Sequence, residues 1–313
     1  TLSPDYLVVI DDSLSGIRSK NRNLVNSIHV PGCKIAYLEN SRTEGASGSW
    51  NTALDFLLRE VEDPTHLFVA ILDDDDAWAP SYLECCHSTA CKHGLDIVAA
   101  DLRRIESDHT SPLIIDGPSQ LRAEDFLTGN PGIQGSNLFL RLSVLLAAGG
   151  FDEALRSTTD RDLCILVADL GFARYGRIPF PLVDHYAVPG QLRLSTSRSE
   201  AKLEGLTAFW RKYAGRMTTG QQQSFSDRAS ELFGWESPAT PELTADTYSD
   251  FAPRTSSLTR IVANREHTSD LLDERVATAE RLVKQRFELN CLRLLGYGSE
   301  AVVFTDEHTV YKC

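Results

Sequence analysis

Long hydrophobic runs are absent from this sequence of 313 residues. A membrane-spanning helix needs about 18 consecutive apolar residues, and the segment from Leu67 to Leu72 is among the longest runs present. The first residues also lack the positively charged stretch that opens a secretory signal peptide. The seven cysteines are an odd set without the spacing of a disulfide framework. We therefore expect a protein without transmembrane segments, located in the reducing cytoplasm.

Basic charge is also scarce in this chain. It carries 31 Lys and Arg against 44 Asp and Glu, a formal net charge of −13. Such a charge repels the phosphate backbone of nucleic acids, so we expect no nucleic-acid partner. With 13 prolines, 20 glycines, 42% hydrophobic and 24% charged residues, the composition is that of an ordinary globular protein and not a low-complexity chain.

Apolar runs alternate with helical patterns over the first 180 residues. This alternation predicts βα units and an α/β fold with a mixed, mainly parallel sheet flanked by helices. Residues 53, 54, 57, 58 and 61 are apolar at helical spacing, which predicts an amphipathic helix over residues 50–61. The expected strands are 6–10, 34–38, 66–72, 95–102 and 137–140, and the other expected helices begin near 80, 142 and 160.

Composition divides the chain into three parts. Residues 1–216 form the expected α/β domain, and the Thr, Gln, Ser and Pro content of 217–257 predicts a linker. The charged segment that begins at residue 258 suits surface helices, and 292–312 resembles a hairpin with a glycine turn. The sequence opens with Thr1 and stops at Cys313 inside an expected strand, so we expect a fragment.

Four consecutive aspartates, Asp73 to Asp76, follow the expected strand 66–72. Like charges this close together destabilise the fold unless a cation or solvent screens them. Carboxylates suit Mg²⁺ or Mn²⁺, and open α/β sheets bind ligands at the carboxyl ends of their strands. The sequence therefore predicts a divalent metal site. The alternative is a solvated acidic loop that caps the helix after Pro80.

Four ordered segments extend this interpretation. They are Val8–Ser13, Asn40–Asn51, Asp73–Pro80, and Gly149–Glu153 followed by Thr159–Leu163. Together they resemble the motifs of family-2 glycosyltransferases, which have the GT-A (Rossmann-like) fold. The resemblance covers roughly residues 6 to 215, and the sequence starts directly at what matches the family's second strand.

The resemblance implies a role for each acidic residue. Asp12 would contact the base of the nucleotide donor, Asp73 the ribose or the metal, and Asp76 would orient the donor sugar. Asp75 would be the main ligand of Mn²⁺ or Mg²⁺. Asp160 would be the general base of an inverting transfer, with the cap of its own helix as the alternative or additional role.

The resemblance further implies a metal-dependent transfer of one sugar. The donor would be a nucleoside-diphosphate sugar, with a UDP-sugar favoured, and the acceptor a hydroxyl group of unknown identity. His185 lies where some members place a histidine near the metal or phosphates, although a histidine after a strand is more often structural. The Gln-x-x-Arg-Trp motif of processive members does not match Gln191–Ser195, which favours single transfer. Thr159 stands where a Glu usually precedes the catalytic aspartate.

A short helical segment holds five potential zinc ligands: Cys85, Cys86, His87, Cys91 and His93. It lacks the paired Cys-x-x-Cys spacing of a structural zinc site, so free cysteines packed in the core are the more frequent outcome.

The C-terminal segment resembles the opening of a kinase-like domain over about 20 residues, with Gly296, Gly298 and Lys312 as a phosphate loop and its lysine. A hairpin turn is the alternative. The competing functional hypotheses are therefore a phosphotransferase whose N-terminal part only binds a sugar nucleotide, and a degenerate binding module without catalysis.

Overall fold

The computed structural model describes residues 2–106, 111–187 and 198–238, and three strands between residues 293 and 312. The chain divides into two compact units, Thr1–Ala252 and Pro253–Cys313. In the second unit β9 (Arg293–Tyr297), β10 (Val302–Thr305) and β11 (Val310–Lys312) form an antiparallel sheet in the order β11-β10-β9. The helices expected from residue 258 lie outside the described residues.

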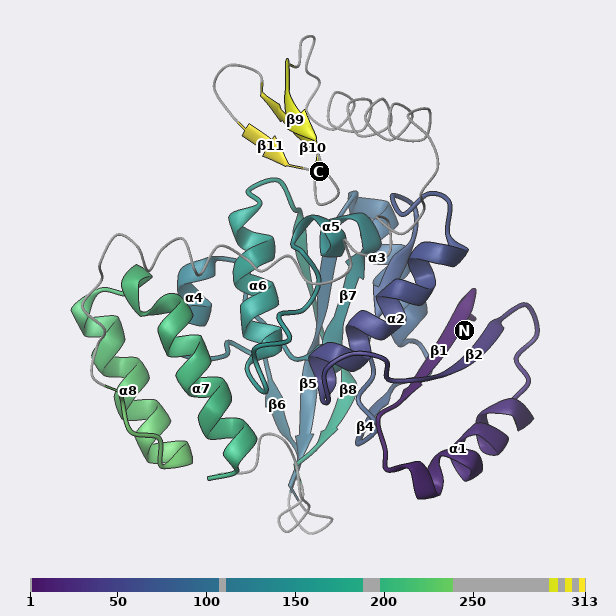
Figure 1. Cartoon of the computed structure of the whole chain (residues 1–313), viewed down its shortest axis with the longest axis horizontal. Helices are drawn as coiled ribbons and strands as arrows, with labels where there is room; N and C mark the ends of the chain where they lie inside the picture. Colours follow the sequence, from purple (N-terminus) through teal and green to yellow (C-terminus); the bar gives the residue numbers. More distant parts are fainter. Residues whose placement is uncertain are drawn as a thin grey trace. The chain divides into compact units, whose positions relative to one another are not determined.

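The centre of the first unit is a six-stranded sheet (Figure 1). Its order is β3-β7-β5-β8-β4, and β6 pairs with β5. The strands are β3 (Phe68–Ala70), β4 (Asp76–Trp78), β5 (Ile97–Ile105), β6 (Leu113–Ile115), β7 (Leu138–Arg141) and β8 (Tyr175–Tyr186).

The expectation of a mainly parallel sheet is wrong for this part of the chain. Only β5 and β8 pair in parallel, and the other pairs within the six-stranded sheet are antiparallel. Periodicity could not reveal this, because a buried strand has the same apolar pattern in either direction. Between β5, which ends at Ile105, and β6, which begins at Leu113, the chain is too short for the crossover connection that a parallel pair requires.

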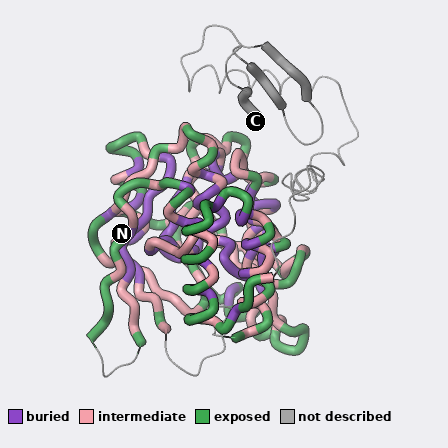
Figure 2. The backbone as a smooth tube through the Cα atoms, turned by 90° about the vertical axis from the view of Figure 1, so that its left-hand side faces the viewer, coloured by how far each residue is buried: buried purple, intermediate pink, exposed green. Residues whose placement is uncertain are grey.

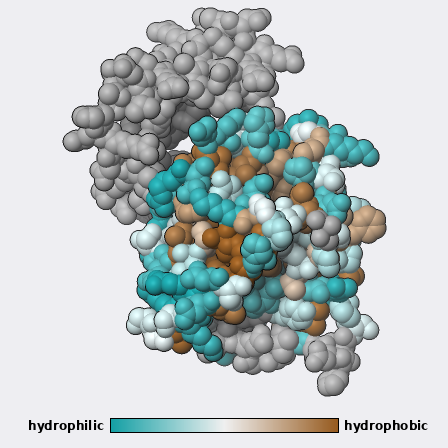
Figure 3. All heavy atoms as spheres, turned by 90° about the vertical axis from the view of Figure 1, so that its right-hand side faces the viewer, coloured by the Kyte–Doolittle hydropathy of each residue, from teal (hydrophilic) through white to brown (hydrophobic). Residues whose placement is uncertain are grey.

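Two further strands form a separate parallel pair, β1 (Tyr6–Asp11) and β2 (Lys34–Glu39). The helix α1 (Ser15–Ser27) connects them, as a parallel pair requires, and α2 (Ala46–Glu60) packs against β1. Viewed from the side of Figure 1 on which β1 and β2 lie, apolar side chains gather within a largely hydrophilic surface (Figure 3).

The expected helices are present with shifted bounds. Helix α2 begins four residues before the predicted start at Trp50 and buries Leu54 and Leu57. Helix α3 (Tyr82–His93) begins two residues after Pro80 and ends at Gly94, whose φ of 60° suits glycine. The remaining helices of the first unit are α4 (Ala123–Leu127), η1 (Gly135–Asn137), α5 (Leu142–Ala147), α6 (Thr159–Asp169), α7 (Glu200–Tyr213), η2 (Ala214–Arg216) and α8 (Thr219–Phe233).

The core lies between the six-stranded sheet and its helices, and buried residues gather inside the molecule (Figure 2). Val98, Ala100 and Leu102 of β5 pack against Tyr82 and Cys86 of α3. Cys86 is thus a free cysteine packed in the core, whereas Cys91 is exposed. Among the described residues no group of three or more His, Cys, Asp or Glu is placed to hold a metal ion.

The prediction of a linker from residue 217 is wrong for residues 219–233, which form α8. Thr218 and Gln221 make a capping box that starts this helix. Phe225 of α8 is buried against Phe209 and Trp210 of α7, and Trp235 packs on the same cluster. The polar composition thus belongs to the exposed face of a packed helix. No described helix is both long and apolar enough to cross a bilayer.

Candidate active site

The acidic segment after β3 forms a tight turn closed by its own backbone. The amide of Asp76 donates to the carbonyl of Asp73 over 3.1 Å. Ser136 of η1 holds both sides of the turn, because its hydroxyl accepts from the amide of Asp73 at 3.1 Å and its carbonyl accepts from the Trp78 indole at 2.7 Å. Gly135 leaves room here, since a Cβ would lie 3.2 Å from the Trp50 ring and 3.6 Å from the Asp73 carboxylate.

The structure brings His185 to this turn. Strands β4 and β8 pair with Asp76 opposite His185, and the His185 Nδ1 lies 3.0 Å from Asp76 Oδ1. The Asp76 side chain is only 1% exposed, so the pair is largely shielded from water. The structure therefore places this histidine in contact with a carboxylate of the acidic turn, and its role near a metal or phosphates stays a prediction.

Negative charge accumulates at the turn. Burial and the charges of Asp76, Asp75 and Asp160 together raise the pKa of Asp73 to about 7, opposed by a hydrogen bond with the Ser136 side chain. Asp160 comes from a helix 87 positions later in the sequence, so its influence on Asp73 shows that the fold brings the two acidic motifs together. Asp74 is exposed. These described carboxylates do not form a group of three or more placed to hold a metal ion. Mg²⁺ typically uses only one or two carboxylates and completes its shell with phosphate oxygens and water, so the turn remains a candidate for that kind of site.

Asp160 is the second residue of α6. The N-cap is Thr158, with a φ of 67°, so Asp160 lies in the first turn and is not the cap. Its Oδ1 accepts from the amide of Arg161 at 2.8 Å, and its Oδ2 accepts from the Asn130 side chain at 3.0 Å. Burial raises the pKa of Asp160 above its ordinary value, opposed by the Arg161 amide and by the charges of Lys202 and Arg161.

Asn130 is a site residue that the sequence did not reveal. Its side-chain oxygen accepts from the amides of Gly132 and Ile133, both at 2.9 Å, while its amide group donates to Asp160 and to the Ile133 carbonyl. The loop is therefore folded around the Asn130 side chain, which also holds the Asp160 carboxylate. The only sequence signal was the Asn-Pro-Gly string itself, which is typical of any turn.

Asp12 organises the loop before α2. Its two oxygens accept from the Asn40 side chain at 2.9 Å and from the Gly45 amide at 2.6 Å. Gly45 has a φ of 110°, which L side chains rarely adopt, so glycine is required at this bend. Asp12 thus contacts the segment that the sequence associated with the donor. The preceding Asp11 points inward and accepts from Tyr37 and Asn21.

The same loop is joined to the Gly-Gly-Phe-Asp-Glu turn by buried ionic contacts. Glu153 accepts from Arg42 at 2.5 Å and from Asn51 at 2.8 Å, and it also bonds to Thr43. Arg42 in turn pairs with Asp55 of α2. Because removing one partner from a buried charge network is strongly destabilising, these residues fix the distance between the two sides of the site.

A second ionic group holds α6 against α7. The Lys212 ammonium lies 2.6 Å from Asp152 and 2.7 Å from Asp162, and Asp162 also accepts from the Tyr213 hydroxyl at 2.6 Å. Asp162 is 1% exposed, so its charge depends on these partners. Sequence reasoning missed both networks, because their members are far apart along the chain.

Residues 3–137 match glycosyl transferase family 2. The match spans less than half of the chain and includes Asp12 and the Asp73–Asp76 turn, whereas Asp160 and His185 lie beyond it. Together with the sheet flanked by helices, it confirms the expected GT-A-like α/β fold class. A comparison with curated proteins gave no match.

The chain is also similar to solved structures at low sequence identity. One is Staphylococcus aureus TarS 1-349 in complex with UDP-GlcNAc, with 13% identity, 88% of this chain and 71% of that chain covered, and a TM-score of 0.49. Another is the mannosyltransferase PcManGT from Pyrobaculum calidifontis in complex with GDP-Man and Mn²⁺, with 18% identity, coverage of 90% and 72%, and a TM-score of 0.41.

The kinase-like interpretation gains no such support. Gly296 lies in β9 and Lys312 in β11, and the strand pairing sets both opposite Val303 of β10. Gly298 lies outside the described residues. The family match ends far before this unit, and we do not pursue the phosphotransferase alternative.

Proposed function

We propose that this protein is a metal-dependent glycosyltransferase that moves one sugar from a nucleoside-diphosphate sugar, with a UDP-sugar favoured, to a hydroxyl acceptor. The observation that carries the proposal is the convergence of Asp160 on the Asp73–Asp76 turn in a chain whose residues 3–137 match glycosyl transferase family 2. A lone acidic turn would fit many proteins, whereas an acidic turn facing a carboxylate with a raised pKa suits transfer chemistry.

The donor side is assigned to Asp12, Asp73, Asp75 and Asp76. Asp12 organises the loop before α2 and would contact the nucleotide base there. Asp75 would be the main ligand of Mn²⁺ or Mg²⁺, with Asp73 beside it. A bound divalent cation would neutralise charge on the leaving diphosphate. Asp76 would orient the donor sugar. Because His185 contacts Asp76, we assign His185 the role of positioning this carboxylate next to the metal.

Asp160 is assigned as the general base. The acceptor hydroxyl oxygen forms a bond to the anomeric carbon while the bond from that carbon to the phosphate oxygen breaks. The electron pair of the broken bond leaves with the nucleoside diphosphate, and the hydroxyl proton passes to the Asp160 carboxylate. Attack from the face opposite the leaving group inverts the configuration. The amide of Asn130 keeps one carboxylate oxygen in place during this step.

The proposed location is the cytoplasm. Among the described residues all five cysteines are free, which suits a reducing compartment that also supplies nucleotide sugars.

The test is a thermal-shift panel of UDP, GDP, CDP and dTDP with and without Mn²⁺, followed by sugar transfer from the matching donors. A ligand at about 100 times its dissociation constant stabilises the fold by about 2.7 kcal/mol. We expect one nucleotide to give a manganese-dependent shift, and Asp75→Asn to abolish both shift and transfer. Asp74→Asn is the matched control, because Asp74 is exposed, and should retain both. Full transfer by Asp75→Asn would refute the metal assignment.

A further inference from the structure

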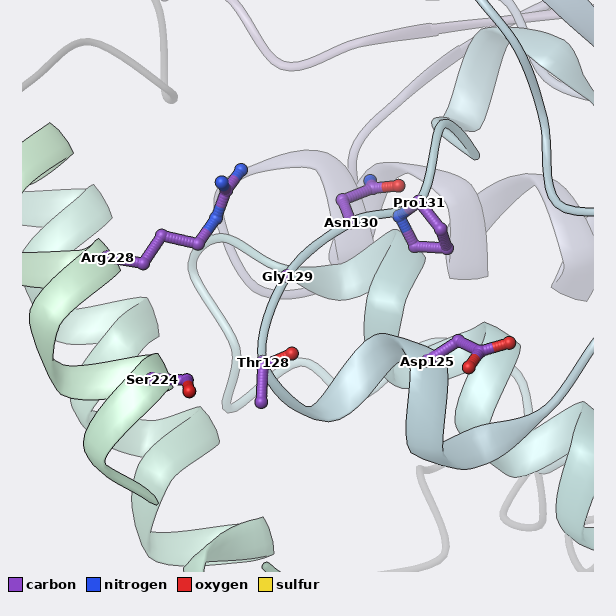
Figure 4. Close-up of a pocket in the computed structure, with 7 residues that line it drawn as sticks. All are labelled: Asp125, Thr128, Gly129, Asn130, Pro131, Ser224 and Arg228. Atoms are coloured by element: carbon purple, nitrogen blue, oxygen red, sulfur yellow. The ribbon is translucent and has the colours of Figure 1, made fainter. Parts of the chain in front are cut away.

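A hollow of about 240 Å³ lies between α8 and the loop that leads from α4 to η1 (Figure 4). Its polar walls are Thr128 and Asn130 from the loop, and Ser224 and Arg228 from α8. The close-up shows these side chains coming from two opposite walls, with the Arg228 guanidinium extended toward the loop (Figure 4). None of the roles proposed above uses this hollow.

Asn130 connects the hollow to the proposed base. It lines the hollow, and its amide also donates to Asp160 Oδ2 at 3.0 Å. A molecule that fills the hollow therefore lies one side chain away from the carboxylate that would take the acceptor proton. The residues assigned to the donor are Asp12, Asp73, Asp75 and Asp76, and none of them lines this hollow.

Arg228 supplies a cation without a partner. Among the residues that the structure describes, its guanidinium makes no hydrogen bond or ion pair, although it lies against Gly129, where an added Cβ would be 3.3 Å from its Nε. A guanidinium has five donors in a fork that fits two oxygens of a phosphate or carboxylate. The Thr128 hydroxyl lines the same hollow, whereas the Ser224 hydroxyl donates to the Gly220 carbonyl at 2.9 Å and is left as an acceptor.

The charge around the hollow is positive in a protein whose net charge is −13. Burial and the neighbouring charges of Arg161 and Arg228 lower the pKa of Lys202 to about 8, while the charge of Asp160 opposes them. The one carboxylate on the wall, Asp125, is already paired with Arg122 at 3.1 Å. An anion would therefore relieve repulsion among cations here.

Arg161 and Lys202 differ from Arg228 because both have partners within the fold. The Arg161 guanidinium donates to the carbonyls of Phe126 and Leu127 at 2.7 to 3.0 Å and lies 4.2 Å from the Phe209 ring centre. Lys202 lies over the Phe233 ring at 4.5 Å. Arg228 is exposed and lies against Gly129, and among the described residues its guanidinium has no such partner, so it is free to bind an anion.

We propose that this hollow binds the acceptor and that Arg228 recognises an anionic group on it, a phosphate or a carboxylate. The substrate class is thus a hydroxyl compound that also carries a negative charge, with the reacting hydroxyl beside Asn130 and Asp160. This inference rests on the proposed glycosyltransferase function and narrows its acceptor.

The experiment compares transfer to three acceptors by the full chain: glycerol 1-phosphate, glyceric acid and neutral glycerol. We expect a preference for the charged acceptors, and the ratio of the phosphate to the carboxylate arm identifies the anionic group. Arg228→Gln should raise KM for the preferred acceptor about tenfold to a hundredfold, the range expected for a charge-assisted contact. Arg211→Gln, an exposed arginine of α7 outside the hollow, is the matched control and should keep the parental KM.

A second variant acts on Arg228 without removing it. Gly129→Ala would place a Cβ 3.3 Å from Arg228 Nε and shift this side chain slightly, so KM for the charged acceptor should rise by a smaller factor while kcat changes little. Equal use of neutral and charged acceptors, or a parental KM in Arg228→Gln, would overturn the inference.

The two proposals can fail separately. If the parent protein shows neither nucleotide-induced stabilisation nor transfer to any of the three acceptors, the glycosyltransferase proposal fails, and this inference falls with it. If the nucleotide shift and transfer are present without any preference for charge, only the anionic acceptor is refuted.

Discussion

At the scale of single residues, the site depends on carboxyl groups whose environments differ. Asp160 is buried beside Lys202 and Arg161, faces the charge of Asp73, and accepts from Asn130. Asp11 is also buried, but its hydrogen-bond donors outweigh burial and hold its pKa well below the ordinary range. Asp160 is therefore suited to take a proton, whereas Asp11 is suited to remain charged and stabilise the fold.

Asp160→Asn should therefore abolish the chemical step and leave donor binding intact. We expect the transfer rate to fall by about 10²- to 10⁴-fold, the usual contribution of a general base, with an unchanged nucleotide-induced thermal shift. In the parent, activity should decline as pH falls through a pKa above 3.8, because burial raises the pKa of Asp160 and its protonated form cannot accept a proton. Asp169→Asn, at the far end of the same helix, is the control. An unaltered rate in Asp160→Asn would favour a non-catalytic binding module.

Tyr37→Phe tests whether the charged Asp11 carboxylate stabilises the fold. It removes the 2.6 Å hydrogen bond to Asp11 and should lower the free energy of unfolding by about 1.5 to 3 kcal/mol at pH 7. A depressed folded pKa stabilises the protein above the unfolded pKa of about 3.9, and this contribution is lost as pH falls. Urea unfolding should therefore show a difference between parent and variant that shrinks below about pH 4. A difference independent of pH would indicate lost packing only.

At the scale of elements, local patterns predicted helices and buried strands well. The spacing of Leu54 and Leu57 predicted α2, and the apolar run before the aspartates predicted β3. Sheet direction and α8 were not predictable in the same way, because both depend on partners far along the chain. The acidic turn, Asp160 and His185 were found as motifs, whereas Asn130, Ser136 and Arg42 act through tertiary contacts that leave no local pattern.

Phe225→Ala tests whether α8 belongs to the folded unit. Phe225 is 1% exposed and packs against aromatic rings of α7, so truncation should lower the free energy of unfolding by about 3 to 5 kcal/mol. Leu232→Ala on the same helix, where the side chain is 42% exposed, should cost much less. Chemical denaturation of the two variants measures both values. Equal and small losses would mean that α8 is a peripheral helix, as the linker prediction implied.

At the scale of the whole molecule, the described site residues and the acceptor hollow all lie within the unit Thr1–Ala252. The boundary predicted from composition, at residue 216, would remove α8 together with one wall of the hollow and half of the aromatic cluster. The boundary seen in the structure, after Ala252, keeps α8, this wall and the whole aromatic cluster in one unit. Two shortened chains, 1–216 and 1–252, therefore separate the compositional boundary from the structural one.

We expect chain 1–252 to unfold in one cooperative transition near the midpoint of the full chain and to keep the same nucleotide-induced shift. Chain 1–216 should be less stable and tend to associate, because loss of α8 exposes the rings of Phe209 and Trp210. Thermal melting followed by size-exclusion chromatography measures both properties. If 1–252 lost the nucleotide shift, residues after 252 would contribute to donor binding. If 1–216 matched 1–252 in stability, the core would end at α7, and the wall that carries Arg228 would be an addition to an already complete fold.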